Sequence, residues 1–299
     1  MIVRDPPSHI QLLFILKGSI VPKIARRVLL LTVMAAVVVL IDRHLVTLPH
    51  ISVAAMGIFG IALSLFLGFR NNAAYDRWWE ARRLWGMLLA DGRSLGRETL
   101  VFLGQGPART ALVRGFVAFA YLHNQSLRGM ARQAEAADWD AAATEHAGRA
   151  NPADAALRAM SEVVRTETVE GRLSDMGQKA LTERLASVTL SQCGCERLAA
   201  TPLPFVYSLL VLRTSYIYCL LLPFALSDTA GTFAPLVEAA AAYVFFGLSA
   251  VTDELEHPFR LGANGMPLDA LCRSVEISAA EALGEVPPSP LSPVDGVLT

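Results

Sequence analysis

The sequence predicts an all-α membrane protein with four transmembrane helices and a large helical domain in the cytoplasm. Hydrophobic residues make up 53% of the 299 residues, and the mean hydropathy is +0.42. The charged fraction of 18% lies below the roughly 25% of soluble proteins. Four apolar segments approach or reach the length that crosses the hydrocarbon core of a bilayer. Together these features exclude an ordinary soluble domain.

The four predicted spans lie at 28–41, 51–69, 203–226 and 233–251. The first is short for a span, but the charged residues that flank it can lengthen it by reaching toward the interfaces. The second carries no charge and continues without Pro or Gly into a charged, Trp-rich stretch, so one helix should leave the bilayer and enter water.

Lys and Arg residues set the expected orientation. Three of them precede the first span and four follow the second, whereas the loops 42–50 and 227–232 together hold a single Arg. By the positive-inside rule, both termini and the middle of the chain are expected in the cytoplasm. The predicted organisation is a cytoplasmic N-terminal segment, two pairs of spans around a helical domain, a cytoplasmic C-terminal segment and a flexible Pro-rich tail, with boundaries 1–27, 28–70, 71–202, 203–252, 253–285 and 286–299.

The candidate pore residues begin with a row on the second span. Ile61, Leu65 and Phe69 are spaced at i, i+4 and i+8, which places them on one helix face. Arranged around a symmetry axis, three such rings would form an apolar neck that gates by dewetting. Ordinary bilayer packing is the alternative interpretation. The same face continues to Asn72 and Asp76, which are expected in an aqueous vestibule.

Leu203 is a second candidate, for an aperture. It lies between Pro202 and Pro204, which keep the backbone out of regular helix. A residue held at such a break can protrude into a permeation path. The alternative is that the two prolines simply end the preceding domain and start a helix.

Two ionisable residues fall inside the third and fourth spans, Arg213 and Glu238. A charge in hydrocarbon costs about 3 kcal/mol or more, so each needs a partner or water. Because their signs are opposite and the spans are consecutive, we expect them to form an ion pair with each other. A direct ion-binding role is the alternative.

Catalysis is not indicated, because the chain lacks the common nucleophile, P-loop, zinc-protease and dinucleotide motifs. The four cysteines and six histidines show no metal-ligand spacing, so no cofactor or metal is expected. A net charge of −1 without a basic patch indicates no nucleic-acid partner.

Three stretches resemble the bacterial bestrophins: GIALSLFLGFRNNAAYDRWWEARRLWG, TPLPFVYSLLVLRTSYIYCLLLPFAL and DELEHPFRLGANGMPLD. The resemblance implies a homopentameric ion channel around one central pore. It implies that Ile61, Leu65 and Phe69 form the neck and that Leu203 forms a cytoplasmic aperture. The acidic run that forms a calcium clasp in animal bestrophins is absent here, so no calcium site is expected.

The resemblance also implies the permeating species and the location. Chloride and other monovalent anions are expected, with cations such as sodium as an alternative for bacterial members, and the location is the bacterial inner membrane. Asp76 favours cations, while Arg70 and Arg77 nearby favour anions. A function from another class, a membrane scaffold or accessory subunit without ion flux, stays open.

Overall fold

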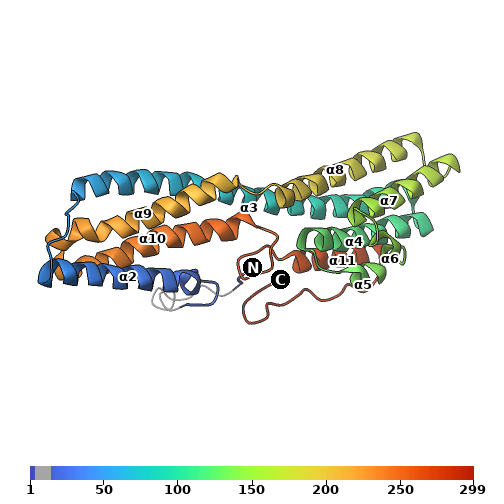
Figure 1. Cartoon of the computed structure of the whole chain (residues 1–299). Helices are drawn as coiled ribbons and strands as arrows, with labels where there is room; N and C mark the ends of the chain where they lie inside the picture. The colour runs from blue at the N-terminus through green and yellow to red at the C-terminus, as the bar shows by residue number, and fades with distance from the viewer. Residues whose placement is uncertain (4–14) are drawn as a thin grey trace. The chain divides into compact units, whose positions relative to one another are not determined.

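The computed structural model describes residues 1–3 and 15–299, and most of these residues fold into helices (Figure 1). Pairing of extended backbone in this part of the chain is limited to isolated bridges near the two termini. The α-helices are α2 (Val21–His44), α3 (Val53–Leu103), α4 (Pro107–Arg128), α5 (Gln133–Ala137), α6 (Ala143–His146), α7 (Pro152–Val169), α8 (Asp175–Ala200), α9 (Phe205–Thr229), α10 (Ala234–Glu256) and α11 (Leu268–Leu283).

Local sequence signals explain several helix ends. The Asn151 side chain accepts a hydrogen bond from the Asp154 amide at the start of α7, and Ser174 does the same for Gly177 at the start of α8. Proline occupies the first turn of α2, α4, α7 and α10, where its missing N–H costs nothing. Gly129 ends α4 in the left-handed conformation that glycine favours.

The chain divides into two compact units. The span unit comprises residues 15–78 and Pro202–His257, and the polar unit comprises residues 1–3, Trp79–Thr201 and Pro258–Thr299. Among the residues that the structure describes, four helices are long and apolar enough to cross a membrane: α2, α3, α9 and α10. The four-span prediction is therefore confirmed at the level of helix length and composition. The first of these helices is longer than its apolar stretch, because it begins at Val21 and includes the basic residues before that stretch.

In the span unit, α2, α9, α10 and the first part of α3 run alongside one another (Figure 1). Their shared core is a cluster of buried apolar side chains drawn from all four helices: Ile24, Leu31, Leu63, Leu67, Val211, Cys219, Ala242, Phe245 and Phe246. Aromatic contacts tie the helices together, with the Tyr218 and Phe245 rings 5.0 Å apart in a T-shaped arrangement. One face of each helix is used in this way, and many apolar side chains on the other faces stay exposed.

The polar unit packs its helices closely. A methyl group on Gly92 of α3 would overlap the Phe116 ring of α4, and one on Gly177 of α8 would overlap Leu173 and press on Phe102 of α3. Trp85 of α3 is fully buried beside His123 of α4. Two short helices, α5 and α6, lie between α4 and α7.

The end of the C-terminal tail forms hydrogen bonds with the rest of the polar unit. Residues 294–297 form a turn closed by two hydrogen bonds of 2.9 Å between Val294 and Val297. The Val3 amide donates to the Gly296 carbonyl, and the Ala270 amide of α11 donates to the Thr299 carbonyl. The two chain ends therefore satisfy some of each other's hydrogen bonds. The flexibility of residues 286–299 stays a prediction.

Candidate functional site

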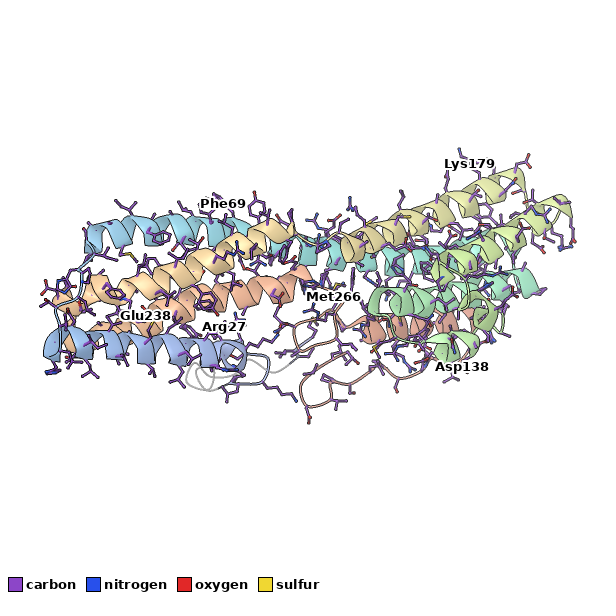
Figure 2. All side chains as sticks on the ribbon, viewed as in Figure 1. Arg27, Phe69, Asp138, Lys179, Glu238 and Met266 are labelled. Carbon is purple, nitrogen blue, oxygen red and sulfur yellow. The ribbon has the colours of Figure 1, made fainter. Side chains whose placement is uncertain are left out.

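The predicted neck row lies on a solvent-accessible face of α3. Ile61, Leu65 and Phe69 are 66%, 57% and 69% exposed, while Leu63 and Leu67 of the same helix are buried in the span-unit core. Figure 2 shows Phe69 on the side of α3 that faces away from α2. Exposed Ile58 extends the row by one turn toward the start of the helix, a position that the three-residue spacing missed. The row is thus available to meet lipid, another subunit or a pore.

Asn72 and Asp76 are also exposed and continue this face. At 100° per residue, both lie within about 20° of Leu65 around the helix axis. Arg70 behaves differently, because it is only 8% exposed and its guanidinium Nη2 lies 3.2 Å from Glu256 Oε2. The positive charge of Arg70, beside the row, is therefore paired with Glu256 inside the span unit. The nearest exposed charge on the row's own face is the Asp76 carboxylate.

Leu203 lies in an irregular segment before α9 and is half-buried. Its backbone N–H donates to Glu256 Oε1 at 3.0 Å. The carboxylate that neutralises Arg70 therefore also holds the predicted aperture residue. Sequence reasoning missed this role of Glu256, since nothing in the order of residues relates positions 70, 203 and 256.

The predicted ion pair between Arg213 and Glu238, both of which the structure describes, does not form within one chain, so this prediction is wrong. Glu238 is fully buried, and the group that interacts with its carboxylate in the described structure is the Cys219 thiol of the neighbouring helix α9, not Arg213. The reason is depth. α9 and α10 are antiparallel and joined by a short turn, so at 1.5 Å per residue Arg213 lies about 24 Å from that turn and Glu238 about 6 Å.

The acidic residues that follow the fourth span are used in ion pairs. Glu254 pairs with Lys23 of α2, and Glu256 pairs with Arg70 of α3. Both partners lie in the span unit, so these carboxylates join three of its helices at one end. This accounts for two of the acidic residues at the end of α10 without a bound cation.

Comparison with known proteins gives a consistent match over nearly the whole chain. Residues 1–281 match the model of the family described as bacterial/fungal bestrophin protein. A voltage-dependent anion channel-forming protein of Mesorhizobium japonicum is 46% identical over 297 residues, covering 97% of this chain and 95% of that protein. A protein of the same name from Escherichia coli is 36% identical over 282 residues, covering 93% and 92%.

Solved structures give the same match. The crystal structure of a bacterial bestrophin homologue from Klebsiella pneumoniae superimposes with a TM-score of 0.82 at 32% sequence identity, and the match covers 88% of this chain and 100% of that chain. The fold of this chain is therefore shared with that protein.

Proposed function

The chain belongs to the bacterial bestrophin family, and on that basis we propose that it forms an anion channel in the bacterial inner membrane. Its curated relatives carry the name of voltage-dependent anion channel-forming proteins. The four membrane-length helices agree with a multi-pass protein. Chloride and similar monovalent anions are the expected permeating species, and both termini are expected on the cytoplasmic side.

We propose that five copies surround one pore and that Ile61, Leu65 and Phe69 line its neck. The observation that carries this proposal is their exposure as a row on one face of α3, while the opposite face fills the core of the span unit. Large apolar side chains that converge on an axis make a constriction from which water withdraws readily, and ions then stop. Leu203 forms the second constriction, and Asn72 and Asp76 line the vestibule below the neck.

The first experiment measures the reversal potential of purified protein in planar bilayers under a NaCl gradient. An anion channel reverses near the chloride equilibrium potential. Reversal near the sodium potential would contradict the anion proposal while keeping the channel. A silent bilayer would contradict both and favour the scaffold or accessory-subunit interpretation.

The neck assignment predicts that Ala at Ile61, Leu65 and Phe69 together raises single-channel conductance, because shorter side chains widen the constriction and admit water. Phe66→Ala is the matched control. Phe66 is another exposed apolar residue of α3, 53% accessible, but it points about 100° away from the row. Equal conductance in the triple variant and the unmodified channel would refute the assignment.

Asp76 provides a test of the vestibule. Its carboxylate repels anions from the proposed path, so Asp76→Asn should raise the chloride-to-sodium permeability ratio, and more strongly at low ionic strength, where screening is weak. Reversal potentials at two salt concentrations measure this. A ratio that does not change at either concentration would remove Asp76 from the path.

A further inference from the structure

Glu256, the last residue of α10, is buried and bonded in three directions. It is 5% exposed. Its Oε2 accepts from Arg70 Nη2 at 3.2 Å, its Oε1 accepts from the Leu203 amide at 3.0 Å, and its backbone carbonyl accepts a long hydrogen bond of 3.5 Å from Arg77 Nε. One residue thus joins α3, α10 and the segment before α9.

The bond to Leu203 is important because of the prolines on either side. Neither Pro202 nor Pro204 has a backbone N–H, so the Leu203 amide is the single backbone donor in residues 202–204. A part-buried amide needs an acceptor, and outside a helix none is supplied by the neighbouring turn. The Glu256 carboxylate supplies it, and the position of this short segment therefore depends on where Glu256 is held.

Glu256 is in turn held by α3. The side chains of Arg70 and Glu256 are each 6% exposed, so each buried charge relies on the other for compensation. One turn earlier on α10, fully buried Thr252 approaches the Asn71 side-chain oxygen at 3.5 Å. Arg70 directly follows Phe69. The path from Phe69 to Leu203 therefore contains one peptide link, one buried ion pair and one hydrogen bond.

We propose that Glu256 is a positioning residue that holds Leu203 in a fixed place relative to the neck, so that the width of the aperture depends on α3. This inference rests on the proposed function, since it takes Phe69 and Leu203 as pore residues. Glu256 itself does not line the pore, because its carboxylate is buried and neutralised. Its effect on ions is transmitted through the Leu203 backbone.

The test compares two double variants of the full-length channel that contain no unpaired buried charge. Arg70→Met with Glu256→Gln keeps a side-chain oxygen that can accept from the Leu203 amide. Arg70→Met with Glu256→Leu has a similar volume and no acceptor. The readout is the permeability of gluconate relative to chloride in planar bilayers, which reports the width of the narrowest aperture rather than stability.

The double variant with Glu256→Leu should show a gluconate-to-chloride permeability ratio up to about fivefold higher than the double variant with Glu256→Gln. This factor corresponds to the free energy of one net hydrogen bond. Glu254→Ala is the matched control, since Glu254 lies two residues earlier and pairs with Lys23 at an exposed site. That variant should keep the ratio of the unmodified channel. Equal ratios in the two double variants would overturn the inference.

Leu203→Ala separates failure of the inference from failure of the proposed function. If Leu203→Ala raises the ratio while the two double variants agree, the aperture stands and the role of Glu256 is wrong. If Leu203→Ala leaves the ratio unchanged, Leu203 is no aperture and the inference falls with it. Should the unmodified channel pass cations, the same double variants are compared by the permeability of N-methyl-glucamine relative to sodium. The outcomes are then interpreted in the same way.

Discussion

Mild acid should destabilise the polar unit through His123. This residue of α4 is fully buried, and its ring stacks on Trp85 at 5.5 Å and on Phe119 at 5.6 Å between centroids. Neither ring nitrogen has a hydrogen-bond partner in the described part of the chain. Burial lowers the pKa of His123 from 6.5 to about 3. The folded protein therefore keeps His123 neutral down to strongly acidic pH.

The direction in which pH changes the free energy of unfolding follows from proton binding. An unfolded chain protonates His123 below pH 6.5, whereas the folded chain does not do so until about pH 3. The unfolded state then binds more protons, so the free energy of unfolding falls as the pH drops from 6.5 toward 3. At 1.36 kcal/mol per pH unit, lowering the pH to about 5 costs about 2 kcal/mol. Above pH 7 His123 is neutral in both the folded and the unfolded chain, so it no longer lowers the free energy of unfolding.

Native-state hydrogen exchange measures this change locally. After correction for intrinsic exchange rates, amides of α4 that open together with the polar unit should lose about thirtyfold in protection between about pH 7.5 and about pH 5, the factor equivalent to about 2 kcal/mol. His123→Phe keeps an aromatic ring between Trp85 and Phe119 and removes the titrating group. An equal loss of protection in this variant and in the unmodified protein would refute the role of His123.

Two further predictions concern packing and charge in the polar unit, and both are measured as thermal unfolding midpoints of the purified protein. Gly92→Ala should destabilise by about 1–3 kcal/mol, because the new methyl group overlaps the Phe116 ring. Gly86→Ala on the same helix should be neutral or stabilising by up to about 1 kcal/mol, because the nearest atom is Arg82 Nη1 at 4.0 Å; shifts of the same sign in both variants would contradict the packing argument. Arg184→Met should destabilise by about 1–3 kcal/mol, because it removes bonds of 2.7 Å to both Asp91 and Glu98 and leaves a buried carboxylate on Asp91 with Ser187 as its remaining side-chain donor. Lys179→Met is the control, since Lys179 belongs to an exposed pair with Glu183 at 3.8 Å and should change the midpoint little.

Helix positions were largely readable from the sequence, because the signals are local. The apolar segments, the prolines in first turns and the capping residues Asn151 and Ser174 all act within a few residues of the backbone that they shape. The row of Ile61, Leu65 and Phe69 follows from helical periodicity alone, and its exposure agrees with that periodicity. Its role as a pore neck stays a prediction that conductance measurements will decide.

The pairing of charges was not readable, and Arg213 with Glu238 shows why. Opposite signs on consecutive spans suggested contact, but antiparallel helices place the two residues at different depths. The residues that do pair near the proposed pore, Arg70 and Glu256, are adjacent to span ends and resemble ordinary interfacial charges in the sequence. Only the closed bundle brings them together.

Composition and helical periodicity were enough to predict four apolar helices with a polar helical unit, and to show which face of α3 carries the apolar row. The tertiary structure alone decided that one carboxylate joins Arg70 to the Leu203 amide and that His123 is sealed between two aromatic rings. The difference lies in how far apart along the chain the interacting residues are. Periodicity and capping depend on residues a turn or less apart, whereas buried ion pairs and desolvation depend on segments far apart in the chain that meet only after the helices pack.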